Sequence, residues 1–275
     1  QVALMGNTKA VGQLGNLATS KWQLADWKIS AQGLSGQVNG VALPLTELKA
    51  QKTDQQLWLA SPKLHLANTQ KLLNTIKGMP AKVNLPVQSL APKGWLNQAQ
   101  LHLDSSQPKE FLVNGKLQQV SVGAWLGVPE IKQVDGHIWL NRYGGKVIID
   151  DTDGVHLRLT KLTSTPWKFG DIQGEFNWHY GALANRFSSS NMVAKLNQGH
   201  INLSMAGSFP RKGSTSEPFI QLALGMQNID LGQLPGMLPD IVLGKKLGAW
   251  ITAASPVGTV TEAALIYNGR PGKLN

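Results

Sequence analysis

Apolar and polar residues alternate strictly in many short stretches of the chain. Val155, Leu157 and Leu159 are separated by His156 and Arg158. The same alternation occurs at residues 201–205, 220–226, 99–103, 64–66 and 147–149. A period of two predicts β-strands that have one apolar and one polar face. The pattern also favours antiparallel pairing, because the strands of a buried parallel sheet read as continuous apolar runs.

One version of this strand pattern occurs twice. Its residues are Ile131, Val134, Gly136, Ile138 and Leu140, and 38 positions later Phe169, Ile172, Gly174, Phe176 and Trp178. A glycine lies on the apolar face in both copies, and Gly115 and Gly207 occupy similar positions elsewhere. A glycine inside a strand indicates a bend, a bulge or space for a ligand or another backbone. The pattern predicts a curved sheet with a spacious apolar side, and tight twist in a closed sandwich is the alternative.

Helical patterns are few. Residues 68–77 place Leu72 and Ile76 on one face, with Asn68 as the expected N-cap and Pro80 as a stop signal. A second helix is predicted near 240–254 from apolar residues at helical spacing. We therefore predict an N-terminal β-rich segment over 1–90, with a helix near 68–77, and a repeated β-sheet region over 91–275, with a helix near 240–254.

Two short helices cannot cover the apolar faces of about a dozen strands, yet each such face must pack against something. Either the sheet closes on itself and forms a dry sandwich, or it curls into a trough whose apolar wall faces a ligand. The predicted fold class is mainly β, with a long, curved, mostly antiparallel sheet that forms an open apolar groove, and with a few short helices.

The sequence carries no recognisable catalytic or metal-binding motif. It has no cysteine, no HExxH, no GxSxG, no phosphate-binding loop and no dinucleotide-binding glycine pattern. The six histidines form no i, i+4 pair, and they stand mostly at polar strand positions. We expect no enzymatic activity, no metal site and no cofactor.

The densest acidic cluster is Asp150-Asp151-Thr152-Asp153-Gly154. It lacks the remaining ligands and the distal glutamate of a calcium loop. Asp153-Gly154 stands between the predicted strands 147–149 and 155–159. That position favours the turn of a β-hairpin.

A formal net charge of +10 would favour anionic partners. The basic residues are scattered, and they do not gather around the nine tryptophans, so we expect no nucleic-acid partner. No apolar run approaches the roughly 18 residues that a membrane-spanning helix needs. Since the chain opens at Gln1 without an initiator methionine, we expect it to be part of a longer protein whose membrane anchor lies outside this segment.

Three stretches near the C-terminus carry a family resemblance: 234–239, which reads LPGMLP, 244–251, which reads GKKLGAWI, and 258–269, which reads GTVTEAALIYNG. A fourth is a spaced pattern of Leu117, Val120, Ser121, Trp125 and Pro129. Together they resemble the YhdP type of the AsmA-like family, and the resemblance spans about residues 90–275. Ile251 stands where the family usually has leucine.

The resemblance implies a periplasmic part of a protein anchored in the inner membrane. It further implies a curled β-sheet with an apolar groove that moves phospholipid toward the outer membrane, without any catalytic residue. From the strand phases we expect acyl chains to contact the following groove residues: Ile138, Leu140, Val155, Leu157, Leu159, Phe176, Trp178, Ile201, Leu203, Met205, Leu222 and Leu224. The alternative is a closed β-sandwich that serves as a scaffold or protein-interaction module of the cell envelope.

Overall fold

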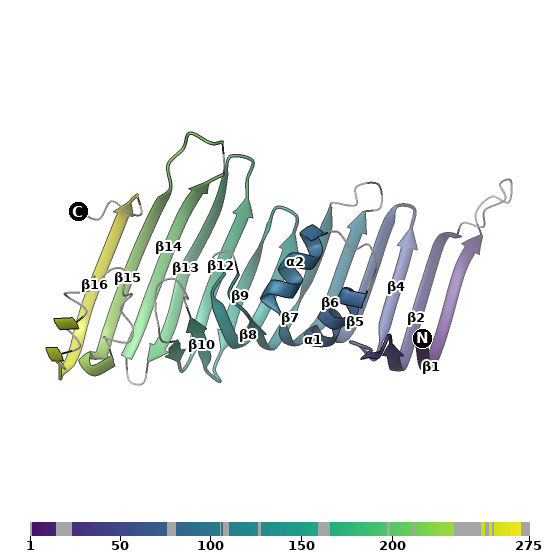
Figure 1. Cartoon of the computed structure of the whole chain (residues 1–275), viewed down its shortest axis with the longest axis horizontal. Helices are drawn as coiled ribbons and strands as arrows, with labels where there is room; N and C mark the ends of the chain where they lie inside the picture. Colours follow the sequence, from purple (N-terminus) through teal and green to yellow (C-terminus); the bar gives the residue numbers. More distant parts are fainter. Residues whose placement is uncertain are drawn as a thin grey trace. The chain divides into compact units, whose positions relative to one another are not determined.

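In the computed structural model the chain divides into two compact units. Figure 1 labels the helices and strands. Unit 1 comprises residues 1–120 and 137–142, and unit 2 comprises residues 121–136 and 143–275. The structure describes residues 2–14, 24–75, 81–104, 106, 110–125, 128–158, 166–196, 199–211, 213–233, 249–250, 253–254 and 256–270.

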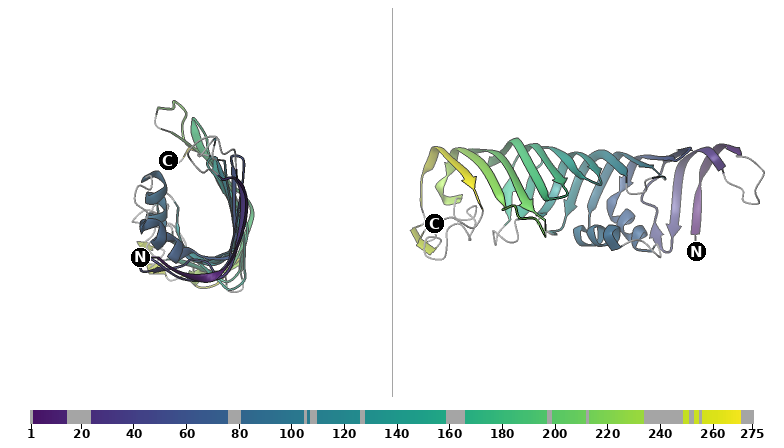
Figure 2. Two further views of the ribbon diagram at one scale, coloured as in Figure 1. Left: turned by 90° about the vertical axis from the view of Figure 1, so that its right-hand side faces the viewer. Right: turned by 90° about the horizontal axis from the view of Figure 1, so that it is seen from above.

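Unit 1 contains most of the described helix. Its elements are β1 (Val2–Leu14), β2 (Leu24–Val38), β3 (Val41–Ala42), β4 (Leu48–Thr53), β5 (Gln56–His65), α1 (Leu66–Thr75), α2 (Ala81–Leu90), β6 (Lys93–Asp104) and β7 (Phe111–Val122), whose last two residues fall in unit 2. The strands follow the order β1-β2-β4-β5-β6-β7, and β3 pairs with β2. Helix α1 packs against β3, β5 and β6, on the side toward which the strands of this unit bend (Figure 2).

Unit 2 is almost entirely strand. Its elements are β9 (Gly144–Asp151), β10 (Val155–Arg158), β11 (Trp167–Phe169), β12 (Ile172–Tyr180), β13 (Ala184–Leu196), β14 (Gly199–Pro210), β15 (Phe219–Asp230), the short 3-10 helix η1 (Leu231–Gln233) and β16 (Thr259–Gly269). β8 (Glu130–Asn141) is divided, with residues 130–136 in unit 2 and 137–141 in unit 1. The main strands follow the order β9-β12-β13-β14-β15-β16, and these neighbouring strands pair antiparallel.

The predicted fold class is confirmed: the chain is mainly β, with an open antiparallel sheet and few short helices. Neither strand path closes on itself, so the closed β-sandwich is wrong for the described strands. The strands bend along their length, as the glycine pattern predicts (Figure 2). No described helix is long and apolar enough to cross a membrane.

The described helices agree with the sequence predictions only in part. The helix near 68–77 is present as α1, but it begins two residues earlier, and the side-chain Nδ1 of His65, rather than Asn68, accepts a backbone N–H in its first turn. Leu66 is therefore helical, so the strand predicted over 64–66 ends at His65. Helix α2 was not predicted, because its internal Pro86 argues against a helix. Most of the helix predicted near 240–254 lies outside the described residues.

A left-handed glutamine or asparagine recurs in the strands. Gln98, Gln119, Gln133, Asn191 and Asn228 have φ between 49° and 61°. Each follows an exposed or half-buried residue and precedes a less exposed one, so that the two inward residues stand three apart instead of two. The inward pairs are Leu96 with Ala99, Leu117 with Val120, Ile131 with Val134, Ser189 with Met192, and Met226 with Ile229. A spacing of three is typical of a β-bulge, and at Asn191 the pairing with β14 does shift by one residue, which keeps both halves of β13 facing the same way. At Gln98 and Asn228 the pairing with β5 and β16 continues without a shift.

The chain between β9 and β10 forms a break in a strand rather than the predicted hairpin turn. β10 does not pair with β9; it pairs with β11 and with the first residues of β8. β9 pairs with β12, which follows β11, so the two broken strands run side by side. Asp151 lies at the break and is 1% exposed. Its carboxylate accepts backbone N–H bonds from Asp135, Asp153 and Gly154 at 2.8, 3.0 and 2.9 Å.

Gly207 shows why glycine stands on the inward face. Its cross-strand partner is Phe187, and a Cβ added at Gly207 would lie 2.4 Å from the Phe187 ring. Gly115 lies under Leu96 in the same way, with its added Cβ 2.7 Å from the Leu96 side chain. These glycines accommodate a large neighbour from the next strand, and such covering is a known way of stabilising a strand glycine.

We predict that Asp151→Ala destabilises the fold by about 3 kcal/mol, because three backbone donors at a buried break lose their acceptor. Asp153→Ala, two residues away and exposed, should change stability by less than about 0.5 kcal/mol. Urea unfolding of both variants measures the difference. Equal stability of the two would mean that Asp151 does not hold the break.

We also predict that Asn191→Val costs about 1–2 kcal/mol, because a β-branched residue is disfavoured in the left-handed region. Asn191→Gly should be neutral or slightly stabilising, since glycine adopts this region freely. Thermal unfolding of the pair tests this. A valine that is tolerated as well as glycine would argue against a left-handed bulge at this position.

Candidate functional site

The predicted groove residues of unit 2 lie in cross-strand rows. Direct partners in an antiparallel sheet project to the same face. One row contains Val147, Phe176, Ser189, Met205, Leu222 and Tyr267; a second contains Met192, Leu203, Leu224 and Leu265; a third contains Asp151, Ile172, Ala194, Ile201, Met226 and Ala263; a fourth contains Trp178, Phe187, Gly207 and Ile220. We call this surface the apolar face of unit 2.

We call the opposite face of the same strands the outer face, and on β9, β12, β13 and β14 it is mainly polar. Its rows contain Lys146, Asn177, Ser188 and Ala206, then Ile148, Glu175 and Ser190, and then His179, Arg186 and Ser208. Phase therefore separates apolar from mostly polar residues from β9 to β14, whereas on β15 and β16 the outer face also carries Phe219, Ala223 and Ile266. Among the residues of these rows, the buried Asp151 is the one charged residue on the apolar face. Its carboxylate is hydrogen-bonded to backbone N–H groups.

The structure brings together seven of the twelve predicted residues. Phe176, Trp178, Ile201, Leu203, Met205, Leu222 and Leu224 all lie on the apolar face, and each is half-buried. Val155 and Leu157 belong instead to the short β10–β11 pair, where Val155 is 2% exposed. Ile138 and Leu140 are half-buried residues of the β8 part that falls in unit 1. Leu159 lies outside the described residues.

Aromatic rings follow one another across the apolar face. Phe176 contacts Trp178 and Phe187 with ring centroids 6.0 and 6.2 Å apart, and Phe187 contacts Phe209 at 5.7 Å. All three pairs are stacked within 30° of parallel. Sequence reasoning missed Phe187 because its phase neighbours on β13, Asn185 and Ser189, are polar and hide the alternation.

The apolar face has no described layer packed over its main rows. Strands β12 to β16 contact chiefly their neighbours in the sheet, and β11 adds a contact to β13 near one end. Even so, Leu203, Met205 and Leu222 are only half-exposed, whereas outer-face neighbours such as Gln221 and Ala223 are exposed. The apolar side chains therefore shield one another, as they do on the crowded side of a bent sheet.

A shallow hollow of about 440 Å³ lies on the outer face, not on the apolar face. Its lining includes Asn202, Ser204, Ala223, Gly225, Ala264 and Ile266, which the register places on the outer face, together with Leu203, Leu224 and Leu265. The three leucines form one row whose side chains project to the other side, so their backbone forms the floor. Small residues in neighbouring strands account for the hollow.

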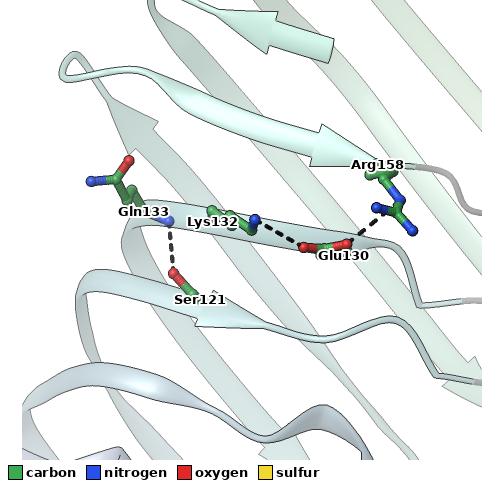
Figure 3. A network of polar contacts seen from close by, with 5 residues as sticks. All are labelled: Ser121, Glu130, Lys132, Gln133 and Arg158. Carbon is green, nitrogen blue, oxygen red and sulfur yellow. Dashed lines mark hydrogen bonds and ion pairs between the residues drawn. The ribbon is translucent and has the colours of Figure 1, made fainter. Parts of the chain in front are cut away.

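Charged groups pair beside the apolar face rather than on it. Glu130 lies between Lys132 and Arg158, with N–O distances of 3.1 and 3.6 Å, and so links β8 to β10 (Figure 3). The Ser121 hydroxyl accepts the backbone N–H of Gln133 at 3.1 Å, at the bulge of β8. Exposed ion pairs of this kind stabilise a fold by about 1 kcal/mol or less, so they set strand position more than stability.

Glu175 has the perturbed carboxyl group of the outer face. A hydrogen-bonded ion pair with Lys146, at 2.5 Å, and a hydrogen bond from Asn177, at 2.7 Å, lower its pKa below the ordinary glutamate value. Since the folded pKa is lowered, the stabilisation is present above the ordinary glutamate pKa and is lost as the pH falls through the folded value. No group of three or more acidic or histidine side chains with metal-binding geometry occurs in the described part of the chain.

We predict that Lys146→Met raises the pKa of Glu175 toward the ordinary value, because the first cause of its lowering is removed. NMR titration of the Glu175 carboxyl carbon measures this shift. Lys195→Met is the control, since Lys195 pairs with Asp171 instead. An unchanged Glu175 pKa in the Lys146 variant would show that the pair does not form in solution.

Comparison with known proteins gives one match. A family model described as YhdP protein matches residues 7–274. The match includes the N-terminal strands, which the sequence resemblance did not reach. No curated protein and no solved structure matches the chain.

Proposed function

The chain belongs to the YhdP family of AsmA-like envelope proteins, and on this basis we propose that it is a non-enzymatic lipid-binding segment whose apolar face holds acyl chains. The observation that supports this most directly is the continuous set of apolar rows on one face of unit 2, over which no described element packs. A surface of this kind usually meets a membrane, a ligand or a partner.

The proposed ligand is a phospholipid that travels between the inner and outer membranes. The protein would lie in the periplasm, attached to the inner membrane through an anchor outside this segment. Acyl chains have no hydrogen-bonding groups, so they require only a dry surface without unpaired polar atoms. The rows around Leu203, Leu224 and Leu265 present such a surface.

Burial of apolar surface alone can hold an acyl chain on the apolar face without fixing its position. Each acyl methylene removed from water contributes about 0.8 kcal/mol, so a tail lying along a few strands would be held by area alone. Rows that repeat from β12 to β16 offer similar contacts at successive positions, so a tail could move from one row to the next with little loss. We therefore propose that the face supports sliding as well as binding.

We propose no catalytic role for any residue. The carboxylates and histidines of the outer face form ion pairs, stack on rings or are exposed to solvent. Glu175 pairs with Lys146, and His179 stacks on Tyr143. We propose no nucleic-acid partner either, because the basic residues are scattered along the sequence. We therefore assign the proposed function to the apolar face.

We predict that Leu224→Asp sharply lowers the lipid that co-purifies with the chain after periplasmic expression, because a charge in the middle row interrupts the dry surface. Ala223→Asp is the matched control: it lies one residue away on the outer face and is exposed. Native mass spectrometry and lipid extraction measure the bound lipid, and circular dichroism checks that both variants fold.

The outcome separates two functions. Lipid bound to the native chain and to Ala223→Asp, but lost from Leu224→Asp, supports the proposal. A folded native chain that is consistently free of lipid would contradict it and would favour a scaffold that contacts other proteins.

A further inference from the structure

Besides Asp151, whose carboxylate is hydrogen-bonded, two short polar side chains lie on the apolar face of unit 2, and both belong to β13. Ser189 lies in the row between Phe176 and Met205, and Asn185 lies between Tyr180 and Phe209. Ser189 is 4% exposed. Within the described residues, neither the Ser189 hydroxyl oxygen nor the Asn185 amide oxygen has a hydrogen-bond partner, although both atoms are buried.

A buried polar atom without a partner costs about 1–3 kcal/mol, and such atoms need an explanation. Here the cost falls twice on one face of one strand. The two residues stand four apart, so their Cα atoms are separated by roughly 13 Å along an extended strand. Phe187 lies between them, with its ring covering Gly207. The three residues form a line of donor, flat ring and acceptor, which we call the polar line.

Resting on the proposed function, we propose that the polar line binds the polar part of one glycerolipid at a fixed position on the sheet. The Ser189 hydroxyl donates to an ester carbonyl or phosphate oxygen of the lipid. The Asn185 amide oxygen accepts from the end of the head group, and the glycerol region lies over the Phe187 ring. The acyl chains then lie on the aliphatic rows of β14 to β16.

This arrangement has a consequence for head-group choice. Asn185 offers an acceptor, so it requires a donor on the lipid. Ethanolamine and glycerol head groups carry N–H or O–H donors, whereas choline has none. Binding a lipid without a donor would leave the buried acceptor unsatisfied, so the site discriminates against choline lipids.

The polar line would also stop a lipid that slides along the apolar face. The aliphatic rows offer equivalent contacts, but hydrogen bonds form only at one position. A lipid would therefore pause at β13 with its head group near the ends of β12 and β14, where Tyr180 and Phe209 are 51% and 41% exposed. The tyrosine ring, with its polar hydroxyl, suits such a boundary between apolar and wet surroundings.

The experiment is a competition in native mass spectrometry between ethanolamine, glycerol and choline phospholipids with identical acyl chains, at equal concentrations, on the 275-residue chain. The native chain should hold ethanolamine and glycerol lipids about fivefold more tightly than the choline lipid, which is the worth of one hydrogen bond. Asn185→Leu should abolish that preference. Ser189→Ala should weaken all three lipids by about the same factor.

Ser188→Ala is the matched control, because Ser188 is the exposed neighbour on the outer face and should change nothing. Lipid-free Ser189→Ala should melt at the same or a higher temperature than the native chain, since removing an unpaired buried hydroxyl relieves its cost. A structural serine would show the opposite shift.

Each result decides something. A native chain that binds all three lipids equally overturns the polar line and leaves the acyl-binding function standing. An equal loss in Ser188→Ala and Ser189→Ala also overturns it. A native chain that binds no lipid overturns both this inference and the proposed function.

Discussion

The alignment of apolar side chains across successive strands is the constraint on which the rest of unit 2 depends. Side chains alternate between faces along each strand, so a shift of one residue in any strand would move its apolar set to the wrong face. At Asn191 β13 takes in an extra residue through a left-handed backbone, and the inward residues resume on the same face. The bulge thereby lets a long strand bend without losing the common apolar surface.

The distribution of charge follows from the same constraint. Lys146 and Glu175 pair on the outer face, while the apolar face keeps one acid, Asp151, whose oxygens are occupied by backbone donors at the break between β9 and β10. A face that is free of unpaired charge is what an acyl chain requires. The two unpaired oxygens on β13 are therefore exceptions that call for a specific ligand group.

Strand type, strand phase and the open sheet could be predicted from the sequence, because alternation such as that of Ile201, Leu203 and Met205 reports both period and face. Three features could not. Asp153-Gly154 has the residues of a hairpin turn, but pairing with β8 and β11 is decided by strands that are distant in sequence. Helix α2 contains a proline that argues against helix. Phe187 was hidden because its phase neighbours on β13 are polar.

The candidate site was predictable to a similar degree. Residues in regular strands, such as Phe176 and Leu222, could be assigned to one face from their spacing alone. Val155 and Leu157 could not be separated from them, because nothing local reveals that β10 leaves the path of the main strands. In the sequence, apolar residues three apart, such as Ile131 and Val134, mark these irregular positions. The left-handed backbone conformation that makes the spacing possible could not be read from the residue types.

The absence of a second layer over the described rows also bears on how unit 2 loses its structure. A strand that contacts chiefly its two neighbours has its stability set by those two borders, so the sheet behaves as a one-dimensional array rather than as a globule with a shared core. Disruption can then begin at β16, which among the described strands pairs with β15 alone, and proceed strand by strand. Loss of order in such a sheet therefore begins at its borders.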